Sequence, residues 1–315
     1  MHKQEAVIAT LGITRRFGPV TAVRDLNISV PRGSVYAFLG PNGAGKTTTI
    51  RIMLGLIRPQ AGQTLLFGEP VRRGALARIG AMIEEPSLYP HLTGWENLEV
   101  TRRLVGAPSR RSAEVLETVN LSADADRLVR GYSQGMRQRL GIALALLNSP
   151  DVLILDEPTN GLDPAGIAYM RRLISGLPMH QETTVFLSSH LLADVEQMAT
   201  HVGIVRDGEL VFEGELEELR RSHCSRLVLE VDRPIDARMT LEHGGWTVER
   251  ANQRRVEVRI GSDADVPLIA RQVIAAGVGL FHLSVDKPTL EELFLDLTSR
   301  GTRRVEKGAA TMEVS

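Results

Sequence analysis

A glycine-rich run, Gly40-Pro-Asn-Gly-Ala-Gly-Lys46-Thr47, separates a short apolar segment from a helical one. Val35–Leu39 before it is apolar enough for a buried strand, and Thr47–Leu56 after it is predicted to be a helix. Glycines let the backbone wrap with its N–H groups pointing inward, and the helix start adds the positive end of its dipole. The order strand, loop and helix indicates a phosphate-binding P-loop. The alternative, an ordinary glycine-rich turn, requires neither the lysine nor these flanking elements.

The loop offers several contacts for the phosphates of a nucleotide. Lys46 is expected to reach the β- and γ-phosphates, and the Thr47 hydroxyl to ligate Mg²⁺. The remaining candidate phosphate contacts in this run are Gly40, Asn42, Gly43, Gly45 and Thr48. The sequence therefore predicts a site for a nucleoside triphosphate with Mg²⁺.

A second apolar strand, Val152–Leu155, ends in two acids, Asp156 and Glu157. At a strand end, Asp156 can hold Mg²⁺ through a water, and Glu157 can act as general base on the attacking water. Such a base contributes about 10²–10⁴-fold to a rate. The alternative is a strand that merely exits to solvent with a polar cap. The P-loop upstream favours the catalytic interpretation.

The rest of the chain predicts an α/β fold with a mostly parallel sheet, because buried strands alternate with helices. Asp207-Gly208 between two alternating segments predicts a hairpin. We expect one domain over residues 1–222 with a helical part at about 93–150, and a small α+β domain over 225–300. Residues 301–315 are predicted to be a disordered tail.

Composition excludes several classes of protein. The net charge of −1 lacks the positive excess that is typical of proteins that bind DNA or RNA, so no nucleic acid is expected as partner. The single cysteine, Cys224, permits no internal disulfide and fits a reducing compartment. The first ten residues lack a secretory apolar core, and no run approaches the roughly 18 apolar residues of a membrane span. Any membrane work is therefore expected of another chain.

Further motifs narrow the choice among P-loop proteins. Tyr132–Gln138 (YSQGMRQ) resembles the ABC signature, Asn160–Pro164 the D-loop, and Ser188-Ser189-His190 the switch histidine. Phe17 stands where that family has an aromatic residue that stacks on adenine, although core packing is an equal alternative. The resemblance is to ABC transporter ATP-binding proteins and runs from about Ala6 to Leu219, in the family's order.

The resemblance implies a RecA-like P-loop NTPase core with an ABC β-subdomain and a helical subdomain. It implies an ATPase that works as a homodimer, or paired with a related ATPase subunit, with ATP and Mg²⁺ between the copies. Ser133 and Gly135 would contact the γ-phosphate on the partner's P-loop, Asp163 would contribute from the D-loop, and His190 would position the attacking water. A separate transmembrane permease would hold the protein at the cytoplasmic face of the membrane.

Two departures from the family pattern are informative. Gln134 replaces a common glycine in the signature and leaves the Ser133 and Gly135 roles intact. Glu84 stands where most members have a glutamine that reaches Mg²⁺ and the water, so Glu84 is expected to be catalytic and a metal ligand. The alternative is a surface acid at Glu84, with Glu85 better aligned. Glu84 and the run Pro86–Gly94 resemble bacitracin-resistance and lantibiotic-immunity exporters.

The C-terminal segment Lys287–Thr298 resembles the closing element of the drug-resistance branch, for which a dimer-supporting role is expected. Apolar Leu88, Tyr89 and Leu92 would line a groove for a helix of the permease, or belong to the core. The chain is thus predicted to energise export of a drug, antibiotic peptide or lipid-like compound. The alternatives are an ABC importer subunit and a soluble ABC ATPase without a membrane partner.

Overall fold

The computed structural model describes residues 5–221, 225–262, 264–286 and 289–299. They form two compact units, the first ending at Leu216 and the second covering Glu217–Ser299. The sequence placed this division slightly later, between residues 222 and 225. The tail predicted for residues 301–315 lies outside the described residues, as does Cys224. Among the described helices, none combines the length and the hydrophobicity that a membrane span requires.

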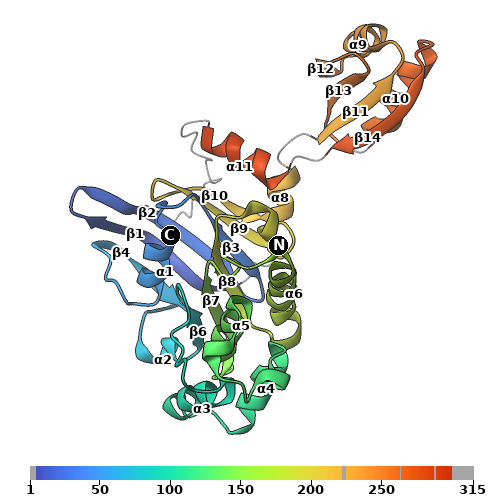
Figure 1. The fold of residues 1–315 in the computed structure, drawn as a ribbon. Helices are drawn as coiled ribbons and strands as arrows, with labels where there is room; N and C mark the ends of the chain where they lie inside the picture. The colour runs from blue at the N-terminus through green and yellow to red at the C-terminus, as the bar shows by residue number, and fades with distance from the viewer. Residues whose placement is uncertain (1–4, 222–224, 263, 287–288, 300–315) are drawn as a thin grey trace. The chain divides into compact units, whose positions relative to one another are not determined.

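The first unit contains a six-stranded sheet of order β10-β9-β3-β8-β7-β6 (Figure 1). Five strands run parallel, and β10 pairs antiparallel with β9. The strands are β3 (Val35–Leu39), β6 (Ile79–Met82), β7 (Val152–Asp156), β8 (Thr184–Ser189), β9 (His201–Arg206) and β10 (Glu209–Glu215). Every residue of β3, β7 and β8 is buried, because a parallel sheet is covered on both faces.

A second, antiparallel sheet has the order β2-β1-β4-β5. Its strands are β1 (Ala6–Phe17), β2 (Val20–Pro31), β4 (Ala61–Leu66) and β5 (Glu69–Pro70). Helix α1 (Lys46–Met53) contacts β2 and β4 of this sheet and β7 of the parallel one, and a single apolar core joins all three layers. This arrangement confirms the predicted α/β fold class.

Local expectations were confirmed at the β9–β10 hairpin and were wrong at the end of α1. Asp207 and Gly208 both have positive φ, 51° and 80°, as the predicted two-residue turn requires. The helix predicted to reach Leu56 ends at Met53, because Gly55 takes a φ of 69° and turns the chain away.

Helices dominate the segment that follows β6. They are α3 (Gly94–Val105), α4 (Arg110–Thr118) and α5 (Gln134–Leu146), with a single turn, α2 (Arg73–Leu76), before β6. Thr93 and Glu96 form a capping box at the start of α3, each side chain bonding the other's backbone N–H. The remaining helices of this unit are α6 (Pro164–Gln181) and α7 (Leu192–Val195).

Glu99 of α3 forms a part-buried ion pair within its own helix and also accepts a hydrogen bond from α4. Glu99 accepts two hydrogen bonds from Arg102 at 2.8 Å and one from Ser112 at 2.6 Å. The bonds from Arg102, and then that from Ser112, lower the pKa of Glu99 from 4.5 to about 2. A carboxylate whose pKa is lower in the folded state stabilises the fold above its unfolded pKa.

Replacing Glu99 by Gln is therefore expected to lower the free energy of unfolding at pH 7 by about 1–2 kcal/mol, since the pair is partly solvent-screened. The difference from the wild type should shrink as the pH falls from 4.5 to about 2, where Glu99 protonates in the native state. Urea denaturation at a series of pH values measures both quantities. A pH-independent difference would show that the Glu99 charge is not responsible.

The second unit is a βαββαβ fold with an antiparallel sheet of order β12-β13-β11-β14, the ferredoxin-like arrangement. Helix α8 (Leu216–Arg221) precedes it, and α11 (Leu290–Ser299) follows it. Its strands and helices are β11 (Ser225–Val231), α9 (Pro234–His243), β12 (Thr247–Ala251), β13 (Arg255–Ile260), α10 (Asp265–Ala275) and β14 (Leu280–Asp286). Leu227, Leu229 and Val231 of β11 point into its apolar core.

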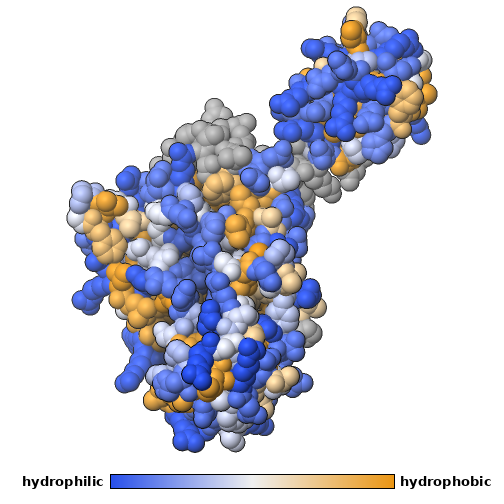
Figure 2. All heavy atoms as spheres, in the orientation of Figure 1, coloured by the Kyte–Doolittle hydropathy of each residue, from blue (hydrophilic) through white to orange (hydrophobic). Residues whose placement is uncertain are grey.

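Ion pairs cover the other face of this small sheet. Glu249 contacts both Arg226 and Arg259, and Glu230 contacts Arg255. The hydrogen bond from Arg259 is the main cause that lowers the pKa of Glu249. The side of this unit seen in Figure 2 is mostly hydrophilic, with a few hydrophobic residues among the polar ones.

Candidate nucleotide site

The glycine loop between β3 and α1 has the conformation that its sequence predicts. Gly43 and Gly45 take φ values of 82° and 95°, a region that favours glycine. A Cβ on Gly45 would lie 2.1 Å from the carbonyl oxygen of Ala22, and one on Gly40 would lie 2.5 Å from that of Val205. The loop thus fits closely between β2 and β9, and these contacts leave no room for a side chain at either glycine.

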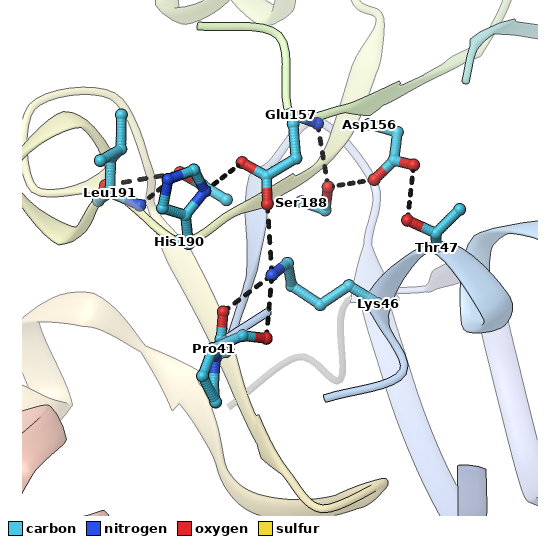
Figure 3. A network of polar contacts seen from close by, with 10 residues as sticks. Pro41, Lys46, Thr47, Asp156, Glu157, Ser188, His190 and Leu191 are labelled. Carbon is cyan, nitrogen blue, oxygen red and sulfur yellow. Dashed lines mark hydrogen bonds and ion pairs between the residues drawn. The ribbon is translucent and has the colours of Figure 1, made fainter. Parts of the chain in front are cut away.

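Lys46, at the start of α1, is only 6% exposed. Its Nζ donates to the carbonyl oxygen of Gly40 at 2.8 Å and to that of Pro41 at 3.3 Å. The same Nζ lies 3.2 Å from Oε1 of Glu157 (Figure 3). The ammonium group therefore sits within the loop and faces the carboxylate that follows β7.

Asp156, the last residue of β7, is 3% exposed and is held from two sides. The Thr47 hydroxyl donates to Oδ2 at 2.8 Å, and the Ser188 hydroxyl donates to Oδ1. Ser188 is placed by register, because Asp156 and Ser188 are paired residues of β7 and β8. The sequence identified Thr47 and Asp156 but assigned no role to Ser188. The sequence did contain a signal for this role, because Asp156 and Ser188 both stand at the end of a buried strand, and such ends meet at one edge of a parallel sheet.

Glu157 is fixed by its backbone as well as by its side chain. It takes a φ of 50°, and its N–H donates to the Ser188 hydroxyl at 3.0 Å. Its second oxygen, Oε2, lies 2.8 Å from Nδ1 of His190, which follows β8. The carboxylate is 21% exposed and the imidazole 32%, so solvent reaches both. One carboxylate oxygen of Glu157 therefore contacts Lys46 and the other contacts His190 (Figure 3).

The signature and D-loop residues come together at a different pocket. Ser133 caps α5 by accepting from the Met136 N–H at 3.3 Å, and Gly135 lies in the first turn of that helix. Asp163 caps α6 by accepting from the Gly166 N–H at 2.8 Å. All three predicted residues line one pocket of about 440 Å³.

Gln134 joins the two loops of this pocket. Its Nε2 donates to the carbonyl oxygen of Asn160 at 3.4 Å, and it lies so close to Gly161 that a Cβ there would be 2.3 Å away. The signature segment and the D-loop are therefore in direct contact within one chain.

Glu84 and Phe17 lie apart from the network around Asp156. Glu84, with a φ of 60°, forms an ion pair with Arg51 of α1 at 2.6 Å, and its side chain is 63% exposed. Within the described part of the chain, the structure gives it no contact with Thr47 or Asp156. Phe17 is 45% exposed, with the Arg15 guanidinium over its ring. Its exposure excludes the core-packing alternative.

The two other predicted loop contacts are accessible. Asn42 is exposed at the tip of the loop, and Thr48 is half-buried in the first turn of α1. Both lie beside Lys46 and Thr47 in the chain, so the structure keeps all the predicted P-loop residues in one segment.

Comparison with known families gives two matches along the chain. Residues 23–160 match the ABC transporter family, and residues 214–298 match the C-terminal domain of the DrrA1-3-like ATP-binding proteins. The first match contains the P-loop, the signature segment and the two acids at the end of β7, Asp156 and Glu157. The second covers most of the ferredoxin-like unit.

Individual relatives extend this likeness over nearly the whole chain. It is 39% identical over 304 residues to the bacitracin transport ATP-binding protein BcrA of Bacillus licheniformis, covering 94% of this chain and 98% of that one. It is 40% identical over 205 residues to the lantibiotic transport ATP-binding protein SrtF of Streptococcus pyogenes, covering 65% and 89%.

Among solved structures, a dimeric ATP-binding cassette, MJ0796, bound to ADP and Pi, superposes with a TM-score of 0.58 at 25% identity. That match covers 66% of this chain and 98% of the cassette. The loop geometry, the two acids at the end of β7 and these relatives agree in one assignment. The chain belongs to the ATP-binding proteins of ABC transporters and is an ATPase.

Proposed function

We propose that this protein hydrolyses ATP to energise export of an antibiotic peptide or a similar drug- or lipid-like compound through a separate membrane subunit. The proposal rests on one polar network. In it Glu157 contacts Lys46 and His190, and Asp156 accepts a hydrogen bond from Thr47. The relatives named for bacitracin and lantibiotic transport support the class of cargo.

Each side chain of the network has a distinct part in hydrolysis. Lys46 binds the β- and γ-phosphates of ATP and leaves Glu157 when the substrate enters. Glu157 then accepts the proton of the attacking water, and His190 holds the carboxylate and the water in line with the γ-phosphate. Backbone N–H groups of the loop and of the start of α1 bind the phosphates.

The residues present also fit Mg²⁺. The Thr47 hydroxyl and the Asp156 carboxylate bring hard oxygen donors together at 2.8 Å, which is the donor type that Mg²⁺ prefers. When bound, Mg²⁺ would neutralise charge on the phosphates of ATP. Glu84 would join these donors only after it leaves Arg51, so its metal and catalytic roles require movement of the loop that carries it.

A second copy of the chain, or a related ATPase subunit, completes the site in this proposal. Ser133 and Gly135 stand at the start of α5 with a hydroxyl and a backbone N–H suited to an anion, and Asp163 lies beside them. These residues line a pocket of their own, so they can bind the γ-phosphate held by a partner's P-loop. The dimeric solved relative supports this arrangement.

A transmembrane permease is the other proposed partner, which places the protein at the cytoplasmic face of the membrane. Tyr89, just before α3, is 50% exposed, and Trp95, in the first turn of α3, is 37% exposed. We propose that this surface, with Leu88 and Leu92, receives the permease. Phe17, with its ring exposed, is proposed to stack on adenine.

Replacing Ser133 by Ala tests the composite site. ATP binding to the isolated chain should be unchanged, because Ser133 is not in the P-loop, whereas steady-state ATP hydrolysis should fall about 10–100-fold. Phosphate release and binding of a fluorescent ATP analogue measure the two effects. The control is Ser87→Ala, an exposed serine outside the pocket, which should hydrolyse ATP normally. Normal hydrolysis by the Ser133 variant would refute the shared site.

A further inference from the structure

A largely buried ion pair lies between the D-loop helix and the switch segment. Arg171 of α6 donates through Nη2 to Oδ1 of Asp194 in α7, and through Nη1 to Gln197 at 2.7 Å. The side chains of Arg171 and Asp194 are 21% and 5% exposed. Burying a carboxylate is costly unless it is paired, so this contact constrains where α7 can lie against α6.

Arg171 and Asp194 form one hydrogen bond, although their two groups could form two. Nε of Arg171 and Oδ2 of Asp194 are both buried and have no hydrogen-bond partner in the described structure. Arginine and carboxylate groups commonly form two parallel bonds, which would satisfy both atoms. A spare donor and a spare acceptor thus remain buried together, and a small shift of α6 against α7 would let them bond.

Each residue of this ion pair lies on a helix that is adjacent in the chain to a proposed functional residue. Asp163 of the D-loop is the N-cap of α6 and lies eight residues before Arg171, or about 12 Å along the helix axis. Helix α7 begins two residues after His190, and the Asp194 N–H donates to the Leu191 carbonyl at 3.2 Å. One ion pair therefore connects the helix that carries Asp163 to the turn that carries His190.

We propose that Arg171 and Asp194 are positioning residues that hold His190 against Glu157 and make its position depend on α6. They touch no reacting atom. A shift of α6 when Asp163 meets the partner copy would be transmitted through the pair to His190, 2.8 Å from Glu157. The inference rests on the proposed role of the Glu157–His190 contact.

The competing explanation is that the pair only stabilises the fold. Val195 and Met198 beside it are buried and would hold α7 in place by apolar packing. The two explanations differ in kinetics, because a positioning role changes kcat and leaves the KM for ATP nearly unaltered.

Asp194→Asn and Arg171→Met in the full chain test the proposal. We expect kcat for ATP to fall about 10–100-fold, since misplacing a catalytic group by about 1 Å has effects of that size, with KM changed less than about twofold. Arg171→Lys should recover part of the loss, because it keeps the charge. Glu99→Gln is the matched control: it removes a part-buried ion pair of α3 and should leave kcat unchanged.

Testing Asp194→Asn in a His190→Ala variant as well as in the wild type distinguishes a positioning role from a purely structural one. Single-turnover rates should be equally low in His190→Ala and in His190→Ala with Asp194→Asn, since Asp194 acts through His190. An equal proportional loss on both backgrounds, or a kcat loss in Glu99→Gln of the same size, would overturn the inference. Wild-type turnover by His190→Ala alone would refute the proposed function itself.

Discussion

Replacing Glu157 by Gln should lower ATP turnover about 10²–10⁴-fold, because the amide keeps the shape of the carboxylate but cannot accept the proton of water. ATP binding should persist and become tighter. In the free protein Glu157 lies 3.2 Å from Nζ of Lys46, so it competes with the γ-phosphate for the ammonium group. The uncharged amide removes both that competition and the repulsion between the carboxylate and phosphate.

Three measurements check this expectation. Phosphate release gives turnover, equilibrium titration with ATP gives affinity, and light scattering gives the mass with and without ATP. The variant should become dimeric when ATP is added, since it binds but does not cleave the substrate. Glu69→Gln, an exposed acid on β5, is the control and should turn over ATP normally. Wild-type turnover by Glu157→Gln would remove this residue from the mechanism.

The parts of the fold that were predictable are those encoded by local patterns. Strands β3 and β7 are near-continuous apolar runs because both faces of the sheet are covered, and the sequence carries that signal directly. The hairpin at Asp207-Gly208 follows from the need for two positive φ values. Helix α9 was not predicted, because only Ala237 and Leu241 of its ten residues are buried and its apolar period is weak.

The parts of the site that were not predictable depend on which segments meet in space. Ser188 contacts both Asp156 and the Glu157 N–H because β7 and β8 pair in one particular register. The contact of Glu84 with Arg51 depends on a loop conformation with φ of 60°. A motif names the residue that a family uses, whereas its partner in a given conformation comes only from the fold.

Replacing Gly45 by Ala should abolish ATP binding and lower the free energy of unfolding by about 3–5 kcal/mol. Two costs combine. A residue with a side chain is strained at φ 95°, and its Cβ would lie 2.1 Å from the backbone oxygen of Ala22, which cannot move without moving β2. The loop would open, and its N–H groups would no longer converge on the phosphates.

Gly43→Ala is the matched control, because Gly43 lies in the same loop at φ 82° but has nothing within 4 Å of its Cβ position. It carries the conformational cost alone, about 1–2 kcal/mol. Urea denaturation of both variants without nucleotide isolates the steric cost, and ATP titration of each then reports the loop geometry. Equal destabilisation by the two substitutions would mean that the loop does not press against β2, and the packing that shapes this phosphate site would have to be reconsidered.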